Sequence, residues 1–186
     1  MTQARRAMTR LVVPVSEERD HIRGPREAPV TLLEYGDYEC PFCGQAYYVL
    51  KDLELRAGNL MRFVFRNFPL TTVHPHAERA AEAAEAAGAQ GRFWEMHDCL
   101  FENQQSLEDE DLLECGALAG LDIHRIVRDM REGRYLNRIR EDFLSGARSG
   151  VNGTPTFFIN GVRHDGSWDL LTLMTAIEEA ARNRRR

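Results

Sequence analysis

Two cysteines separated by two residues, Cys40 and Cys43, are the residues of this sequence with the most specific chemistry. They lie where an apolar, β-prone segment ends and a segment with helical periodicity begins, which is the setting of a redox-active C-x-x-C pair. A helix N-terminus presents unpaired N–H groups and the positive end of the helix dipole, so it stabilises the first sulfur as a thiolate. We therefore predict that Cys40 is the nucleophile and Cys43 the resolving thiol, with Pro41 at the first helical position.

A C-x-x-C pair is also half of many structural zinc sites, which need about four ligands at compatible spacing. The other two cysteines, Cys99 and Cys115, lie in separate predicted helices and form no second pair of this kind. We therefore predict no metal site. Cys115 lies on an apolar helix face and is expected to be a buried free thiol, whereas Cys99 lies off the main apolar stripe of its helix. A disulfide between these two is the alternative, although disulfides are rare in the cytosol.

Three histidines could suggest a metal site, but their positions favour structural roles. His74 and His76 flank a proline where a helix begins, and His97 lies on a core-facing helical stripe. No cofactor is expected beyond the cysteine pair itself.

A carboxylate in the middle of an apolar strand is the second chemical signal. Glu34 lies within the segment 30–35, which is bounded by Pro29 and Gly36 and is typical of a buried central strand. Burial would raise the pKa of this carboxyl, and a carboxyl so placed can accept or supply the proton of Cys43. The alternative is that Glu34 lies at a strand edge and forms a surface salt bridge.

A proline directly before a β-prone segment is the third signal. Thr154-Pro155 leads into the segment 156–159, and proline removes a hydrogen bond from a strand ladder. A cis peptide bond before Pro155 would leave the Thr154 backbone open to pair with an extended substrate and would bring the proline ring against the sulfurs. The alternative is an ordinary turn before a strand.

The elements predicted around these residues follow the order β-α-β, helices, β-β-α. Asn160-Gly161 between the last two strands favours a type I′ hairpin. This order describes an α/β core that is interrupted by an all-helical insertion. The predicted parts are an extended N-terminal arm at 1–28, the first half of the core at 29–73, the helical insertion at 74–150 and the second half of the core at 151–186.

The composition is that of one soluble folded unit. Hydrophobic residues make up 43% and charged residues 28% of the 186 residues, and the formal charge of -5 gives no electrostatic reason for nucleic-acid binding, despite the three arginines at 184–186. The arginines near the N-terminus precede a short apolar segment, 11–15, which is too short for an export signal. No segment is long enough to span a membrane. We therefore expect a cytoplasmic protein.

Four segments of the sequence resemble one group of bacterial proteins: residues 34–43 (EYGDYECPFC), 74–77 (HPHA), 93–98 (FWEMHD) and 153–161 (GTPTFFING). Together with the helical insertion, they resemble the DsbA-like branch of the thioredoxin superfamily over residues 20–182. Some relatives in this group are fused to sodium/proton antiporters. The resemblance implies a thioredoxin fold with an all-helical insertion between the β-α-β and β-β-α halves.

The resemblance also implies disulfide exchange on proteins, with protein thiols or disulfides as substrates and a redox partner that recycles the enzyme. Four residues take the family's functional positions: Cys40, Cys43, Pro155 and, as the buried acid, Glu34. Three neighbours are expected to contact the substrate: Pro41, Phe42 and Thr154.

Two other functions are open on the same fold. A glutathione-dependent transferase or isomerase is one, but such proteins commonly lack the second cysteine, so Cys43 argues against it. An adaptor that binds peptides at Thr154-Pro155, with the cysteines as a redox switch, is the other. Periplasmic DsbA proteins carry histidine where this chain has Phe42. We expect a weaker oxidant here, because phenylalanine provides no charge or hydrogen bond near the sulfur.

Overall fold

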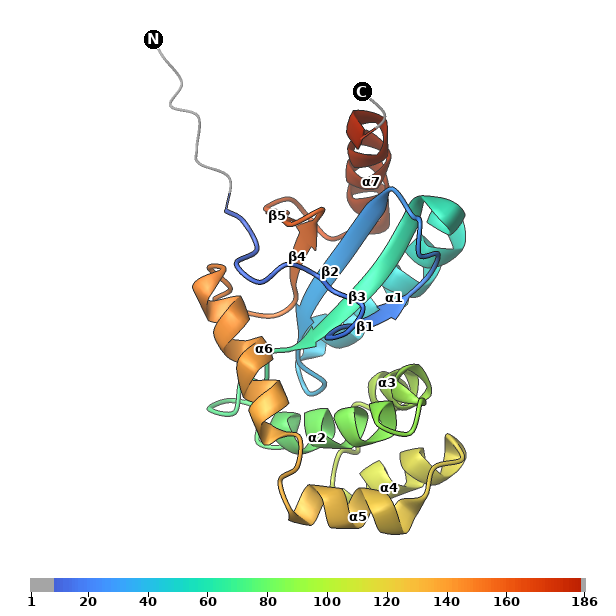
Figure 1. The fold of residues 1–186 in the computed structure, drawn as a ribbon, viewed down its shortest axis with the longest axis vertical. Coiled ribbons are helices and arrows are strands. Elements are labelled where there is room, and N and C mark those ends of the chain that lie inside the picture. The colour runs from blue at the N-terminus through green and yellow to red at the C-terminus, as the bar shows by residue number, and fades with distance from the viewer. Residues whose placement is uncertain (1–8, 185–186) are drawn as a thin grey trace.

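The centre of the protein is a five-stranded sheet with the strand order β1-β3-β2-β4-β5 (Figure 1). Its strands are β1 (His21–Arg23), β2 (Val30–Gly36), β3 (Met61–Asn67), β4 (Thr156–Ile159) and β5 (Val162–Arg163). β2 lies in the middle, parallel to β3 and antiparallel to β4, and the short strands β1 and β5 form the two edges. The structure, a computed structural model, describes residues 9–184. The predicted arm up to residue 8 and the arginines at 185 and 186 lie outside the described residues.

The helices divide into a core set and an insertion. They are α1 (Pro41–Ala57), α2 (Ala77–Gly88), α3 (Phe93–Glu102), α4 (Asp109–Leu118), α5 (Ile123–Arg131), α6 (Leu136–Arg148) and α7 (Leu170–Arg184). α1 connects β2 to β3, α7 follows β5, and α2 to α6 form the predicted helical insertion between β3 and β4. In Figure 1, α2 to α5 gather at one end of the sheet and α6 runs alongside it. Between residues 9 and 184, no helix is long and apolar enough to cross a membrane.

Both faces of the sheet are covered because alternate residues of β2 point to opposite sides. Val30 and Leu32 pack in the layer that contains α1 and α7, whereas Leu33 and Tyr35 pack against the N-terminal segment and α6. All four side chains are buried. Glu34 continues the first set, so its carboxyl lies on the face of the sheet that α1 covers.

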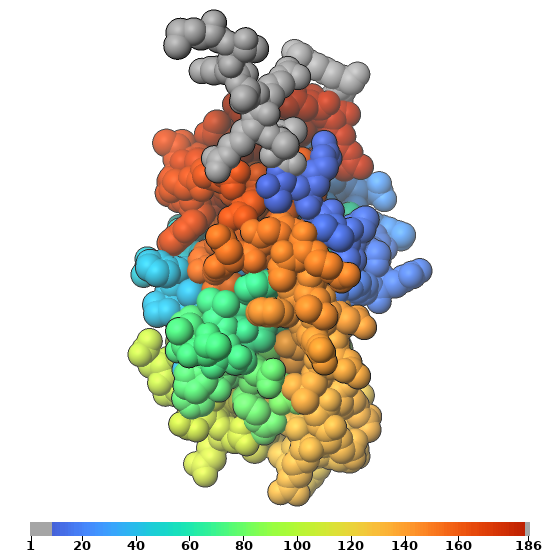
Figure 2. Space-filling view, turned by 90° about the vertical axis from the view of Figure 1, so that its left-hand side faces the viewer, coloured from blue at the N-terminus to red at the C-terminus, as the bar shows by residue number. Residues whose placement is uncertain are grey.

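The N-terminal segment contributes a strand that the sequence did not predict. Residues 21–23 form β1, which is too short to show a strand period but pairs antiparallel with β3. Arg66 of β3 is fully buried, and its guanidinium donates to both carboxylate oxygens of Asp20 (2.8 and 2.9 Å) and to two backbone oxygens of the segment. Figure 2 shows this segment, in blue, beside the orange residues of α6. The segment is therefore part of the folded core.

The turn between β4 and β5 has the predicted geometry. Asn160 and Gly161 have positive φ angles of 49° and 77°, as the two central residues of a type I′ turn require. The predicted hairpin is therefore confirmed.

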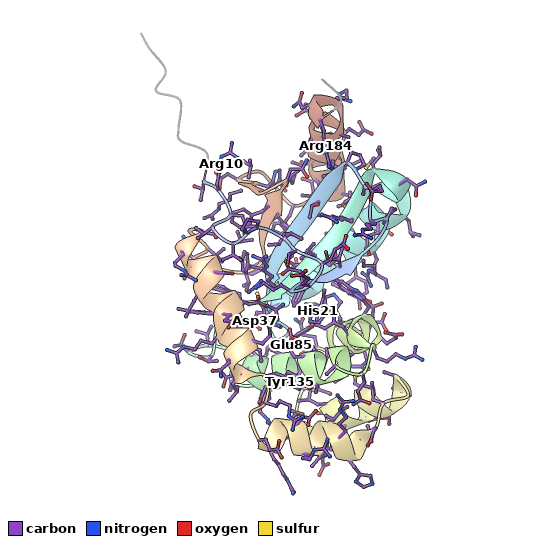
Figure 3. The ribbon with its side chains drawn as sticks, viewed as in Figure 1. Arg10, His21, Asp37, Glu85, Tyr135 and Arg184 are labelled. Atoms are coloured by element: carbon purple, nitrogen blue, oxygen red, sulfur yellow. A yellow bond between two sulfur atoms is a disulfide. The ribbon has the colours of Figure 1, made fainter. Side chains whose placement is uncertain are left out.

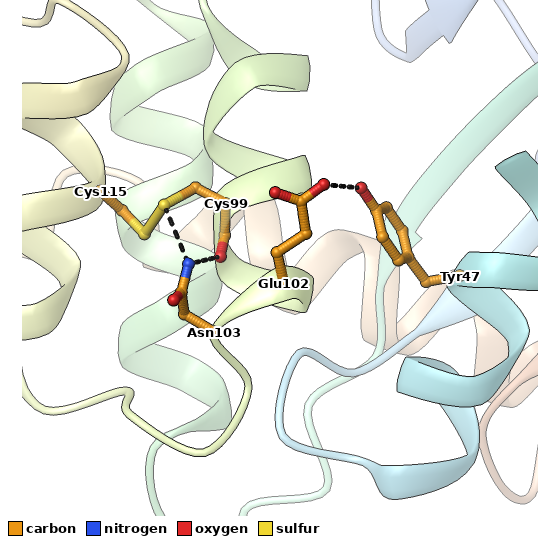
Figure 4. The surroundings of a disulfide bond; sticks show 5 residues. All are labelled: Tyr47, Cys99, Glu102, Asn103 and Cys115. Carbon is orange, nitrogen blue, oxygen red and sulfur yellow. Dashed lines mark hydrogen bonds between the residues drawn. A yellow bond between two sulfur atoms is a disulfide. The ribbon is translucent and has the colours of Figure 1, made fainter.

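A disulfide joins Cys99 of α3 to Cys115 of α4 (Figure 4). The expectation that Cys115 is a free thiol is therefore wrong. The short loop between the two helices brings the Cα atoms of these residues to 5.7 Å, which is within the range that a disulfide spans. This proximity depends on how α3 packs on α4, so it cannot be predicted from the apolar pattern of either helix alone.

Candidate active site

The cysteine pair lies at the N-terminus of α1, directly after the loop that leaves β2. Cys40 is the N-cap residue, with an extended backbone (φ -70°, ψ 120°), and Cys43 lies in the first turn. Both are free thiols in this structure, and their exposed fractions are 4% and 0%. Pro41 begins the helix, where its missing N–H leaves no helical hydrogen bond unmade. The strand-to-helix junction predicted from the sequence is therefore present.

The two thiols differ strongly in their tendency to ionise. The pKa of Cys40 is lowered to about 5, because the Cys43 thiol and the backbone N–H groups of Cys43 and Phe42 hydrogen-bond its sulfur, although burial opposes this. The pKa of Cys43 is raised well above its ordinary value, chiefly by burial and also because its proton is held between the two sulfurs. At neutral pH the pair therefore consists of one thiolate, on Cys40, and one thiol, on Cys43.

Glu34 lies under the cysteine pair on the face of the sheet that α1 covers. Its exposed fraction is 1%, so the alternative of a surface salt bridge is wrong. Burial raises the pKa of this carboxyl to about 8, the charge on Cys40 adds to that rise, and a hydrogen bond with the Cys43 thiol opposes it. Its Oε1 atom is buried without a hydrogen-bond partner among the described residues. A carboxyl with this pKa can both accept and release a proton near neutral pH.

We expect the substitution Glu34→Gln to slow thiol exchange about 100-fold at pH 7, the typical contribution of a positioned acid or base. The amide keeps the shape of the carboxyl but cannot take the proton of Cys43. At pH 5 the carboxyl is itself neutral, since its pKa is about 8. The free energy of unfolding at pH 5 should therefore stay close to that of the wild type. Single-turnover reduction of a model disulfide and urea unfolding measure the two quantities.

The matched control is Glu110→Gln, which makes the same chemical change at an exposed position in the first turn of α4. It should leave the exchange rate unchanged. An unchanged rate in Glu34→Gln as well would contradict a role for this carboxyl in proton transfer.

The loop before β4 brings a second segment of the chain to the sulfurs. The peptide bond between Thr154 and Pro155 is cis. The backbone oxygen of Thr154 lies 3.4 Å from the Sγ atom of Cys40, and it accepts a hydrogen bond from this sulfur when the thiol is protonated. Pairing of Tyr35 with Thr156 holds this loop beside the end of β2, where the cysteine pair follows.

Two of the residues predicted to contact a substrate lie at the surface. Pro41 is exposed and Phe42 is 59% exposed, whereas Cys40 directly before them is buried. A partner that reaches the sulfur of Cys40 must therefore approach next to this apolar surface.

Asp37 is a residue of the site that the sequence analysis missed. Its backbone N–H lies 3.5 Å from Sγ of Cys43, and its buried carboxylate accepts hydrogen bonds from the N–H groups of Glu39 and Leu70 and pairs with Nδ1 of His74. Figure 3 shows Asp37 between the sheet and the helical insertion. Asp37 thus connects the loop before the cysteine pair to the loop after β3. In the sequence, Asp37 is distinguished only as an acidic residue three positions before Cys40.

The three histidines that were weighed as metal ligands have partners within the protein. The pairs are His74 with Asp37, His76 with Glu39 and His97 with the Tyr38 hydroxyl. Within residues 9–184, no group of three or more side chains is arranged to hold a metal ion. Each histidine instead joins segments of the fold around the cysteine pair.

Comparison with known proteins gives several relatives over most of the chain. The chain is 51% identical over 170 residues to the Na(+)/H(+) antiporter NhaA 1 of Salinispora arenicola, which covers 91% of this chain and 26% of that protein. It is 43% identical over 169 residues to the Na(+)/H(+) antiporter NhaA of Herminiimonas arsenicoxydans, covering 91% of this chain and 27% of that protein. The chain therefore spans about a quarter of the length of these curated relatives.

Solved structures and a family model show which fold and family the chain resembles. A thioredoxin-like oxidoreductase from Silicibacter pomeroyi has a TM-score of 0.79 and 27% identity, over 89% of this chain and 94% of that one. BdbD from Bacillus subtilis, at 21% identity, has the same fold, with a TM-score of 0.77 over 90% of this chain and 95% of that one. The thioredoxin family model matches residues 16–179. The chain thus belongs to the thioredoxin family, and it shares its fold with thioredoxin-like oxidoreductases and with DsbA proteins.

Proposed function

We propose that this protein exchanges dithiols and disulfides on protein substrates through Cys40 and Cys43. The observation that carries the proposal is the opposite ionisation of the two sulfurs: the pKa of Cys40 is lowered to about 5, while that of Cys43 is raised. Only a thiolate attacks a disulfide. A protein with a thiolate on Cys40 and a protonated thiol on Cys43 is therefore suited to two successive exchange steps.

In the first step the Cys40 thiolate attacks one sulfur of a substrate disulfide. A mixed disulfide forms, and the other substrate sulfur leaves as a thiolate that takes up a proton. In the second step Cys43 gives its proton to Glu34 and attacks Sγ of Cys40. The mixed disulfide breaks, the Cys40–Cys43 disulfide forms, and the substrate leaves with both sulfurs reduced. A redox partner then returns the pair to the dithiol, and the same steps in reverse oxidise a substrate.

The surroundings of Cys40 support a protein substrate in an extended conformation. The Thr154 backbone oxygen lies 3.4 Å from the sulfur and the adjoining Pro155 directly precedes the strand β4, so a peptide laid along this loop would pair with Thr154. The exposed Pro41 and Phe42 offer apolar contact on the other side of the sulfur. We propose that these four positions bind the substrate around the reacting cysteine.

The experiment that tests the proposal is reduction of insulin by the wild type, Cys40→Ser and Cys43→Ser. We expect the wild type to turn over, Cys40→Ser to lose activity to background, and Cys43→Ser to stop at a mixed disulfide that gel electrophoresis without reductant reveals. Turnover by Cys43→Ser with glutathione and a small substrate would instead support a transferase. Peptide binding without turnover by the wild type would support an adaptor.

The cellular compartment in which the protein works is a separate question. The sequence predicted a cytoplasmic protein, yet the disulfide between Cys99 and Cys115 is of a kind that is rare in a reducing cytosol. Alkylation of thiols in intact cells before lysis would show whether this pair is oxidised where the protein works. The names of the antiporter relatives describe much longer proteins, and no ion transport is proposed for this chain.

A further inference from the structure

Gln104 reaches from the helical insertion to the backbone of the cysteine loop. It lies in the loop between α3 and α4, and its Nε2 atom donates hydrogen bonds to the backbone oxygens of Tyr38 and Cys40, both at 2.8 Å. The Cys40 oxygen also accepts the first hydrogen bond of α1, from Gly44 N–H at 3.1 Å. One side-chain amide from another part of the fold therefore holds the N-cap residue that carries the reactive sulfur.

Gly44 is shaped to receive this amide. A Cβ atom placed on Gly44 would lie 2.2 Å from Oε1 and 2.9 Å from Cδ of Gln104, closer than any side chain could approach. A larger residue after Cys43 would therefore force the Gln104 side chain to move away from the first turn of α1. Gly44 thus leaves open the space that the Gln104 amide occupies.

The loop that carries Gln104 is itself fixed. The disulfide between Cys99 and Cys115 closes the chain on both sides of the loop, and the Asn103 side chain donates to the backbone oxygen of Cys99 at 2.9 Å (Figure 4). The amide of Gln104 thus belongs to a segment whose conformation is already restrained. A restrained donor loses little conformational freedom when it binds its acceptors.

We propose that Gln104 is a positioning residue for disulfide exchange: by holding the Cys40 carbonyl, it keeps the N–H groups of the first turn of α1 aimed at the Cys40 sulfur. The inference rests on the proposed function. Gln104 acts through the backbone of Cys40, and the N–H groups that it orients belong to Phe42 and Cys43, which hydrogen-bond that sulfur. The helical insertion then contributes to the chemistry of the thioredoxin core.

The test compares Gln104→Met and Gln104→Glu with the wild type. Methionine has the length of glutamine and no N–H, so it fills the space beside Gly44 without donating. Glutamate keeps the shape, loses the donor and adds a negative charge near the sulfur. We expect the pH of half-maximal alkylation of Cys40 to rise by about one unit in Gln104→Met, the effect of one hydrogen bond. Exchange at pH 5 should then fall about fivefold, because about half of the wild-type Cys40 but only about a tenth of the variant's is thiolate at that pH. The shift should be larger in Gln104→Glu.

The control is Gln105→Met, a neighbouring exposed glutamine, which should titrate like the wild type. Thermal unfolding of the oxidised proteins checks that each variant is folded, and a variant that does not fold is replaced in the comparison by the other. A wild-type alkylation midpoint in a folded Gln104 variant overturns the inference. The proposed function fails separately, if the wild type does not reduce insulin or Cys40→Ser still does.

Discussion

Reduced protein is expected to react with iodoacetamide at Cys40 with a midpoint near pH 5, and at Cys43 only in alkaline solution. The reason is the distribution of hydrogen bonds at the N-terminus of α1. The Cys43 thiol and backbone N–H groups donate to the Cys40 sulfur, whereas Cys43 is buried and faces the carboxyl of Glu34. Alkylation at pH values from 4 to 10, followed by peptide mass mapping, measures both midpoints. Equal alkaline titration of the two cysteines would contradict the assignment of Cys40 as nucleophile.

The same shift makes the stability of the reduced protein depend on pH. The pKa of Cys40 falls from 9.0 in the unfolded chain to about 5 in the folded protein. Between these values the unfolded chain binds the proton and the folded protein does not, so the contribution of Cys40 to the free energy of unfolding rises with pH. This contribution is fully present above pH 9 and is lost as the pH falls through 5. Glu34 contributes in the opposite direction, because folding raises its pKa to about 8, so its contribution falls as the pH rises from about 4.5 to 8. The oxidised protein keeps Glu34 but has no Cys40 thiol, so the difference in the free energy of unfolding between the reduced and the oxidised protein should rise with pH.

The substitution Arg66→Met is expected to destabilise the fold by about 3–5 kcal/mol, because it leaves the buried carboxylate of Asp20 without its fully buried partner and with only the partly exposed Arg19 beside it. Arg66 and Asp20 have side chains with 0% exposure, and their closest approach is 2.8 Å. The guanidinium also donates to the Tyr35 hydroxyl at 3.1 Å, so the change removes a donor from the core of the sheet as well. Urea unfolding of the oxidised protein at pH 7 measures the loss.

The matched control is Arg92→Met, which removes the same charge from an exposed pair with Glu95, three residues along α3. Exposed pairs contribute about 0–1 kcal/mol, so this variant should unfold close to the wild type. The double variant Asp20→Asn, Arg66→Met should recover part of the stability that Arg66→Met loses, because the buried charge is gone. A loss below about 1 kcal/mol in Arg66→Met would show that the N-terminal segment is held in place by other contacts.

The parts of the fold that the sequence predicted are those with local signals. The apolar segment around Glu34, the helix that begins at Pro41 and the turn at Asn160-Gly161 each depend on residues close together in the chain. Their positions in the structure agree with the prediction. Because Glu34 interrupts a strand that is otherwise apolar, its burial under the cysteine pair could also be anticipated.

The parts that the sequence did not predict depend on segments that meet only in the folded protein. β1 has three residues and gains its strand geometry from β3. The disulfide between Cys99 and Cys115 depends on the packing of two helices, and Gln104 has no neighbour in the sequence that marks it as a partner of Cys40. Gly44 was visible in the sequence, but the sequence did not show that a side chain of the insertion packs against it.

The position of the insertion has a consequence for synthesis on the ribosome. The contact between Cys40 and Thr154 joins residues 114 positions apart, with the whole insertion between them. At about 5–20 residues per second, a ribosome takes roughly 6–23 s to add the chain between these two positions. During that interval β4 does not exist, so β2 lacks its antiparallel neighbour and the Cys40 sulfur lacks its contact with the Thr154 oxygen. The cysteine pair therefore exists in the nascent chain before the loop that faces it, and the site is complete only when the last strands are made.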